Sequence, residues 1–308
     1  MEKKKGSVYA SLKTSGCGQK SFYSVSVDSG IEVSFFNLQG DSFSFSHKHR
    51  PYTLIVDFCR KGRIGWTMQN GDTFFAGEND FLIHNAGSCA QSRVKLPLGF
   101  YSGISLSFDL ELIDTAFLQK IGTDFSLDDI VKSFCIKEYS QSFAAEDFVT
   151  GIFNNLKDEK IQCVKSLFKL NCYSLLTYLG AFHHFKHSVL RLNSQIKIEK
   201  VRKVTDFLKK DLQKHYTIAN LSEIFGINPT TLQESFKDIT GQSIDAFVKE
   251  IRMNKAEDLL EDESLSIGEI AHRLGYMNQG KFSTAFKMRK GIGPLEYRKR
   301  IKNLFKEA

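Results

Sequence analysis

The sequence predicts an α+β protein of two domains, with a β barrel in the front part and an all-helical domain at the C-terminal end. Short runs of β-branched and aromatic residues, separated by Gly, Asn and Asp, fill residues 20 to about 108, as in a sandwich or barrel. After Asp109 the apolar residues recur three and four apart, which is typical of helices. Beyond residue 200 a helical pattern occurs twice, about 50 residues apart.

Length and charge agree with this division. The 308 residues suit two domains, which we place at 1–192 and 193–308 because the stretch around Asn193 is polar. The net charge is +7, and residues 196–308 hold 21 Lys and Arg against 16 Asp and Glu. The first 195 residues hold 21 against 19. The larger positive excess at the C-terminal end favours a polyanionic partner there.

The sequence predicts a cytoplasmic protein. Its six cysteines are scattered without C-x-x-C spacing, which suits a reducing compartment better than a disulfide framework. The Lys3-Lys4-Lys5 run is followed by polar residues, so we expect no signal peptide. No segment approaches about 18 uncharged apolar residues, so we expect no membrane span.

In the front domain we expect a barrel over 20–108 and helices over 109–190. The expected strands include "FYSVSV", "IEVSFFNL", "YTLIVDFC", "FFAGENDFLI" and "FYSGISLSF", and "DLELIDTAFLQKI" reads as a helix with an acidic cap. A long helix over 160–187 carries an apolar stripe of Ile161, Val164, Phe168, Cys172, Leu175, Leu179 and Phe182. The stripe could pair with a second copy or pack on its own β domain, and the sequence leaves both open.

The C-terminal repeat consists of two copies of one small unit. "LSEIFG" (221–226) matches "IAHRLG" (270–275), and "FKDITG" (236–241) matches "FKMRKG" (286–291). Each copy is a helix, a glycine turn and a second helix, with Asn228 or Asn278 as the cap of the second helix. This arrangement is helix-turn-helix geometry.

The second helix of each copy has one apolar face and one short polar face. Leu232, Phe236 and Ile239 fall together in the first copy, and Phe282 and Phe286 do so in the second. The polar residues are left where a recognition helix meets base edges in the major groove. Any single amphipathic helix has a polar face, but two of them behind matched glycine turns predict DNA binding.

The stretch between the copies, 243–262, contains no helix breaker and reads as one helix of about 30 Å. One turn of DNA is about 34 Å long. A rigid connector of this length would hold two recognition helices in successive major grooves on one face of the duplex.

Residues 200 to 303, above all "IAHRLGYMNQGKFSTAFKMRKGIGPLEYR", resemble the DNA-binding domain of the AraC/XylS family of bacterial transcription regulators. The resemblance implies seven helices, two helix-turn-helix units and double-stranded DNA as partner. By matching position it implies base-reading roles for Thr230, Gln233, Glu234, Gln279, Gly280, Ser283 and Thr284. Phosphate contacts are expected from Lys237, Lys281, Lys287, Arg289, Lys290 and Arg298.

Two positions depart from the family pattern. Glu234 stands where members often carry a basic residue, so the first helix would bind weakly or prefer a cytosine amino group. Ser222 replaces the usual small alanine, which packing should tolerate.

The front domain resembles the cupin-like jelly roll that many family members place before the DNA-binding domain. The resemblance rests on the strand count and on "HKHRPYTLIVDFCRKGRIGWTMQNGDTFFAGENDFLIHN", and it implies a small-molecule effector. The effector-binding residues that we expect are His47, His49, Phe58, Trp66 and His84, although aromatic strand residues are more often core. His47-x-His49 also occurs in metal-dependent cupins, but no Glu follows within five residues, so we expect no metal and no cofactor.

Three functions fit these features. The first is a sequence-specific transcription regulator, not an enzyme, that responds to an effector by a population shift. It would be a homodimer through the N-terminal domain and the 160–187 helix, with RNA polymerase as a candidate partner. The second is a metal-dependent cupin enzyme with an accessory DNA-binding tail, and the third is a non-specific architectural DNA binder. We adopt the first as the prediction.

Overall fold

The computed structural model describes residues 11–13, 18–46, 50, 52–67, 73–87, 91–120, 122–136, 140–156, 165–184, 189, 192–193 and 195–304. The chain divides into two compact units, residues 1–195 and 196–308. Strands and helices make up the first unit, and the described part of the second is helical. The predicted α+β architecture with two domains is therefore confirmed.

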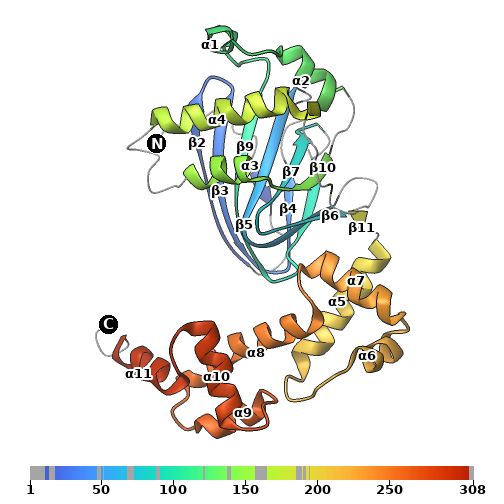
Figure 1. Ribbon diagram of the computed structural model, residues 1–308, viewed down its shortest axis with the longest axis vertical. Helices are drawn as coiled ribbons and strands as arrows, with labels where there is room; N and C mark the ends of the chain where they lie inside the picture. Colours follow the sequence, from blue (N-terminus) through green and yellow to red (C-terminus); the bar gives the residue numbers. More distant parts are fainter. Residues whose placement is uncertain are drawn as a thin grey trace. The chain divides into compact units, whose positions relative to one another are not determined.

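The first unit is built on antiparallel strands (Figure 1). They are β1 (Ser11–Lys13), β2 (Gln19–Asp28), β3 (Ile31–Gln39), β4 (Ser42–Ser46), β5 (Thr53–Thr67), β6 (Thr73–Gly77), β7 (Asp80–Asn85), β8 (Gln91–Lys95), β9 (Phe100–Asp109), β10 (Ser140–Ala144) and β11 (Leu192–Asn193).

The long strand β5 belongs to two sheets. Its first part, from Thr53, pairs with β9 and β7, and its last part, Arg63 to Thr67, pairs with β6 and β8. The register on β9 shifts between Cys59 and Lys61, and such a bulge bends a strand. One sheet therefore has the order β2-β3-β9-β5-β7-β10, and the other has the order β1-β4-β8-β5-β6-β11.

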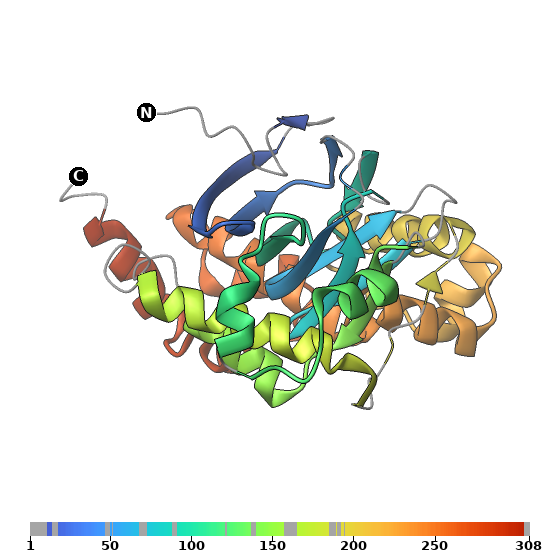
Figure 2. The ribbon, with the colours of Figure 1, turned by 90° about the horizontal axis from the view of Figure 1, so that it is seen from above.

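Helices contribute side chains to the core on one face of the first sheet. They are α1 (Thr115–Lys120), α2 (Leu127–Phe134), α3 (Asp147–Asn155), α4 (Lys165–Gly180) and the short 3-10 turn η2 (Phe182–His184). Helices α3 and α4 lie across the strands (Figures 1 and 2). Leu54, Val56 and Phe58 of β5 belong to the core under these helices, where the Phe58 ring stacks on Phe153 at 4.6 Å.

The intervening residues of β5 point to the other side of the sheet, because side chains alternate along a strand. Ile55 and Cys59 belong to a second core, together with Phe45 and Trp66, and Phe45 and Trp66 stack at 6.0 Å. The β unit thus has one core beneath its helices and another between its two sheets.

The helix expected from Asp109 begins later than predicted. Asp109 is still part of β9, where it pairs with Thr53, and its N–H donates to the carbonyl of Gly30. The first helical residue is Thr115, and the Asp114 carboxylate accepts the N–H of Ala116 at 2.9 Å. The acidic residue at the helix start is therefore Asp114.

The region 109–190, which we expected to be helical, also contains the strand β10. Its five residues pair with β7 and set Phe143 opposite Phe81, with the rings 5.3 Å apart. The prediction missed this strand because five residues with a single large apolar side chain carry little periodic signal.

Helix α4 buries the predicted apolar stripe inside its own unit. Phe168, Cys172, Leu175 and Leu179 are at most 1% exposed and belong to the core beneath the helices. Ile161 and Val164 lie outside the described residues. Of the two interpretations left open, packing on its own β domain holds, and this stripe is not available to a second copy.

The second unit contains the seven helices that the resemblance implied, within residues 195–304. They are α5 (Gln195–Lys210), α6 (Ile218–Phe225), α7 (Pro229–Thr240), α8 (Ile244–Glu261), α9 (Ile267–Arg273), α10 (Gln279–Lys290) and α11 (Pro294–Leu304). The expected unbroken connector is α8. Among the described residues, no helix combines the length and the apolar character needed to cross a membrane.

Phe58→Ala should destabilise the β unit strongly. The ring is 1% exposed and stacked on Phe153, so its loss leaves a cavity that costs about 3–5 kcal/mol. Phe148→Ala on α3 is the control, because Phe148 is 54% exposed and should cost about 1 kcal/mol or less. Urea unfolding followed by Trp66 fluorescence measures both, since Trp66 is the only tryptophan. Equal losses from the two variants would contradict this packing.

Candidate nucleic-acid interface

The second unit contains two helix-turn-helix units, α6–α7 and α9–α10. Gly226 follows α6 with φ 59°, and Gly275 precedes α10 with φ 75°. Both values lie in the left-handed region, which glycine enters without steric cost. The two predicted turn glycines therefore make the turns.

The second helix of each unit is capped by the predicted asparagine. The Asn228 side chain accepts the N–H of Thr230 at 3.0 Å, and Pro229 occupies the first helical position. The Asn278 side chain accepts the N–H of Lys281 at 2.9 Å. These caps fix where α7 and α10 begin, and so they fix which residues stand in the first turn.

The sequence repeat is also a repeat of packing. Phe236 meets Phe247 with ring centroids 5.4 Å apart at 76°, and Phe286 meets Tyr297 at 5.2 Å and 75°. Tyr297 also donates to Glu257 at 2.7 Å, and burial, together with this bond, raises the pKa of Tyr297 to about 12. In both copies a phenylalanine of the second helix thus packs edge-on against an aromatic ring of the helix that follows it.

The buried and exposed faces of α7 and α10 follow the helical pattern. Leu232, Phe236, Phe282 and Phe286 are fully buried. Six of the seven residues expected to read bases are exposed: Thr230, Gln233, Glu234, Gln279, Gly280 and Thr284. Ser283, the seventh, is half-buried.

The six residues expected to contact phosphate fall into two groups. Lys237, Lys281 and Lys287 are exposed on α7 and α10. Each of the other three already contacts its own domain: Arg289 pairs with Glu250, Lys290 pairs with Glu257, and the Arg298 Nε–H donates to the carbonyl of Leu260. Lys290 would have to leave Glu257 to reach a phosphate, whereas the two arginines have further N–H donors besides those already bonded.

The two helix-turn-helix units differ in charge. Residues 217–241 hold one lysine against three acidic residues, whereas residues 266–291 hold five Lys and Arg against one acidic residue. A polyanion is attracted to the second helix-turn-helix unit, α9–α10, and repelled by the first, α6–α7. The sequence repeat therefore conceals an electrostatic difference between its copies.

Helix α8 joins the two helix-turn-helix units without a break (Figure 1). Its 18 residues span about 27 Å, which is close to one turn of DNA. Phe247, near its start, packs on α7, and Met253, Ala256 and Leu260 pack in the core of the second helix-turn-helix unit. One helix thus belongs to both cores.

The structure brings together two of the residues expected to bind an effector and separates a third from them. Trp66 and His84 meet between the two sheets, with their rings 5.5 Å apart and nearly perpendicular. Phe58 belongs to the other core, beneath the helices. His47 and His49 lie outside the described residues.

In the structure a third residue, Asp57, lies beside His84, and the sequence did not predict it there. Its carboxylate lies 2.9 Å from Nε2 of His84, and both side chains are at most 3% exposed. Asp57 pairs across the strands with Ser105, and Ser105 pairs with Ser34, so these buried polar residues form a row on one face of the sheet. The available signal was a carboxylate inside the apolar run "TLIVDFC".

Comparison with known proteins identifies the C-terminal domain. Residues 221–300 match a protein-family model described as a helix-turn-helix domain. The chain is 34% identical over 83 residues to the HTH-type transcriptional activator Btr of Bacillus subtilis, covering 27% of this chain and 16% of that protein. It is 26% identical over 153 residues to the HTH-type transcriptional regulator ExsA of Pseudomonas aeruginosa, covering 50% and 55%. The aligned part thus spans about half of ExsA and less of Btr.

Among solved structures, the chain is similar to fatty-acid-bound ToxT of Vibrio cholerae, with 14% identity and a TM-score of 0.35 over 88% of this chain and 95% of that one. The family match and the duplicated geometry define the second unit as a DNA-binding domain with two helix-turn-helix units. This domain is of the AraC type, and the chain is 30% identical over 92 residues to a putative AraC-like transcription regulator of Streptomyces lividans.

Gly275→Ala should destabilise the second unit more than Gly226→Ala. A Cβ at Gly275 would lie 2.6 Å from the carbonyl oxygen of Gln213 and 2.8 Å from that of Leu212, whereas a Cβ at Gly226 meets nothing within 4 Å. Both variants carry the left-handed penalty of about 1–2 kcal/mol, and the clash at Gly275 adds about 1–3 kcal/mol. Thermal unfolding followed by the helical circular dichroism signal measures the difference. Equal destabilisation would mean that Gly275 is needed only for its backbone angle.

Proposed function

We propose that the chain is a sequence-specific DNA-binding transcription regulator whose helices α7 and α10 enter successive major grooves. The observation that carries the proposal is the duplication: the two helix-turn-helix units have corresponding turn glycines, asparagine caps and aromatic pairs, and α8 joins them. Its length of about 27 Å suits neighbouring grooves on one face of DNA.

The exposed residues of α10 suit direct base reading. Gln279 stands in the first turn, and a glutamine can donate to N7 and accept from N6 of adenine. Gly280 presents no side chain, so the helix can approach the base edges closely. Thr284 lies one turn further along the same exposed face and can contact a thymine methyl group.

The exposed residues of α7 suit recognition of a different kind. Gln233 can read adenine, and the Glu234 carboxylate can accept from the amino group of cytosine. The negative charge of the first helix-turn-helix unit repels the phosphates, while Lys281 and Lys287 on α10 attract them. We therefore propose that α10 supplies most of the affinity and that α7 supplies discrimination between sequences.

The β unit is proposed to be a cupin-like jelly roll that binds a small-molecule effector between its sheets. Asp57, His84 and the serine row offer hydrogen-bonding groups in an apolar interior, and Trp66 offers a ring beside them. No Lys or Arg is buried among the described residues of this unit, which disfavours an anionic ligand. A neutral or cationic ligand with hydroxyl or amine groups fits this lining.

The regulatory step is proposed to be a population shift that effector binding drives. A homodimer through the β unit is part of this proposal, and the exposed Leu167 and Leu170 on α4 offer it an apolar surface. RNA polymerase is a further proposed partner, and a cytoplasmic location is proposed with it. The rival function, a metal-dependent cupin enzyme, would need stoichiometric metal in the purified protein.

Gln279→Ala should weaken binding to the cognate site by about 1–3 kcal/mol and leave binding to random DNA unchanged. The cognate site is first obtained by selection from genomic fragments with the full chain, and binding is measured by fluorescence anisotropy. Lys287→Gln is the matched control on the same helix. Lys287→Gln should weaken binding to the cognate duplex and to random DNA by the same factor, and should make the slope of log K against log salt less steep by about 0.9. Recovery of no defined site in the selection would contradict the regulator assignment.

Binding of an effector should change the fluorescence of Trp66, the only tryptophan, because its ring lies beside His84. The same compound should alter DNA affinity, and Asp57→Asn should weaken its binding. A library of sugars, polyols and amines screened by fluorescence measures the first effect, and Phe148→Ala serves as a control for general damage. A compound that shifts DNA binding without any change at Trp66 would place the effector elsewhere.

A further inference from the structure

Arg252, on α8, is the only buried Lys or Arg in the part of the chain that the structure describes. It is 5% exposed, and burial lowers the pKa of its guanidinium. A cation in such a place needs several hydrogen bonds, because its desolvation is otherwise uncompensated. The partners of Arg252 therefore indicate what the residue holds in place.

The guanidinium binds the loop that leads into the first helix-turn-helix unit. Its Nε–H donates to the carbonyl of Leu212 at 3.0 Å, and Nη2 donates to the carbonyl of Lys214 at 3.1 Å. This loop, residues 211–216, connects α5 to α6. The Asp211 carboxylate orders it further by accepting the N–H groups of Gln213 and Lys214.

The same loop binds the turn of the second helix-turn-helix unit. The His215 Nε2–H donates to the carbonyl of Gly275 at 2.7 Å, and the Gln213 amide contacts Nδ1 of His272 at 3.1 Å. The Arg252 guanidinium also lies 5.9 Å from the centre of the Tyr276 ring. Arg252 thus stands where the loop before α6, the helix α8 and the turn before α10 meet.

This junction is not a continuous apolar interface. His215, Arg252, Gly275 and Tyr276 help to line a cavity of about 700 Å³ that also reaches α10. Leu212 of the loop packs against the core of the second helix-turn-helix unit, and beside that contact the loop is attached by directional hydrogen bonds. Losing them should change the orientation of the two units before it unfolds either one.

We propose that Arg252 is a positioning residue that sets the rotation of α10 relative to α7, and with it the base-pair spacing of the sites that the protein accepts. Helix α8 sets the distance between the two helix-turn-helix units. The bonds of the 211–216 loop to Arg252 and to the turn at Gly275 fix the rotation of one unit relative to the other about the axis of α8. Rotation matters because one turn of DNA holds about 10.5 base pairs, so each base pair corresponds to roughly 34°.

This inference rests on the proposed function for its consequence on DNA but not for its geometry. The first experiment therefore uses no DNA. Spin labels are placed on the full chain through non-natural amino acids at Thr231 on α7 and Met288 on α10, which are both exposed. Arg252→Met, which keeps the length of the side chain without its donors, should broaden the distance distribution between the labels.

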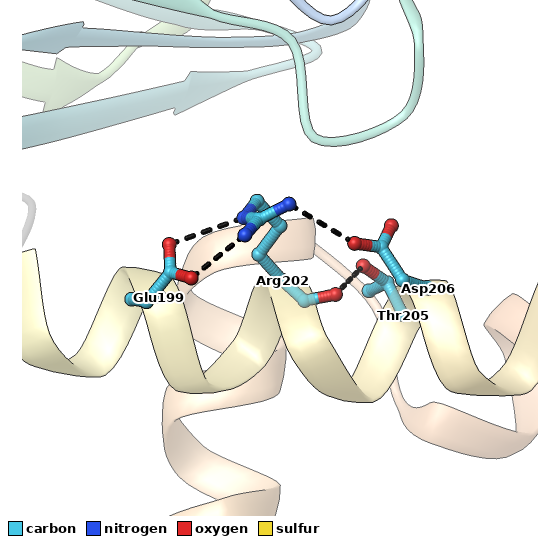
Figure 3. Close-up of polar contacts among 4 residues, drawn as sticks. All are labelled: Glu199, Arg202, Thr205 and Asp206. Atoms are coloured by element: carbon cyan, nitrogen blue, oxygen red, sulfur yellow. Dashed lines mark hydrogen bonds and ion pairs between the residues drawn. The ribbon is translucent and has the colours of Figure 1, made fainter.

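Arg202→Met is the matched control. Arg202 lies exposed on α5, where it donates to Glu199 at 2.7 Å and to Asp206 at 3.2 Å on the same helix (Figure 3). The same substitution there removes ion pairs without touching the junction, so the distance distribution should not change. His215→Ala is the milder test variant, because His215 is exposed and its loss should broaden the distribution even if Arg252→Met does not fold.

The second experiment measures spacing on DNA. Against a selected site, Arg252→Met should lose about tenfold to a hundredfold in affinity, since two modules that are no longer oriented together lose avidity. Its affinity for a duplex carrying only the half bound by α10 should stay within about twofold, and sites with one base pair inserted or removed should be discriminated less. A residue that only stabilises the fold would lower the melting temperature without altering the spacing preference.

The two proposals fail in different ways. An unchanged label distance in folded Arg252→Met and His215→Ala overturns the positioning role, whatever the protein does with DNA. A broadened distance in a protein that selects no DNA site leaves the positioning role standing and overturns the regulator assignment.

Discussion

The unbroken helix α8 is the constraint on which the DNA-binding unit depends. Its 18 residues supply Phe247 to the aromatic pair that holds α7, and Met253, Ala256 and Leu260 to the core that holds α10. A kink in this helix would move one recognition helix relative to the other, because each is packed against a different part of it. The caps and turns decide what each recognition helix presents, and α8 decides how far apart they present it.

The two recognition helices share a frame but not a surface. Gly226 and Gly275 both enter the left-handed region in the turn, and Asn228 and Asn278 make the same kind of cap. The exposed faces, in contrast, differ in charge, with Glu234 on α7 and Lys287 on α10. Core residues must match in both copies because both frames bury the same contacts, whereas exposed residues are free to specialise.

The β unit separates packing from chemistry along a single strand. Leu54, Val56 and Phe58 of β5 fill the core beneath the helices, whereas Asp57 lies on the opposite side with His84. Since alternate residues face opposite sides, one strand can stabilise the unit and carry a polar pair. A buried carboxylate and imidazole are costly to place in an apolar core, so their presence there points to a role beyond packing.

Much of the DNA-binding unit was predictable because its signals are local. The turn glycines, the asparagine caps, the four-residue spacing of Phe282 and Phe286, and the unbroken stretch 243–262 each act within one helix or turn. Three features were not predictable in this way: the late start of α1, the strand β10 and the burial of the 165–180 stripe. Each depends on which distant segment of the chain packs beside it, and the local sequence pattern does not show that.

What the sequence by itself determined is therefore the order of the elements, the faces of the recognition helices and the duplicated frame, since periodicity and backbone preference act over a few residues. Only the tertiary structure decided that Phe58 and Trp66 belong to different cores and that Asp57 meets His84. It also decided that Arg252 holds the loop at 211–216, and that His215 of this loop bonds to the turn at Gly275. Those pairings join residues from different strands, loops and turns, and hydrogen bonds between such segments exist only once the chain has folded.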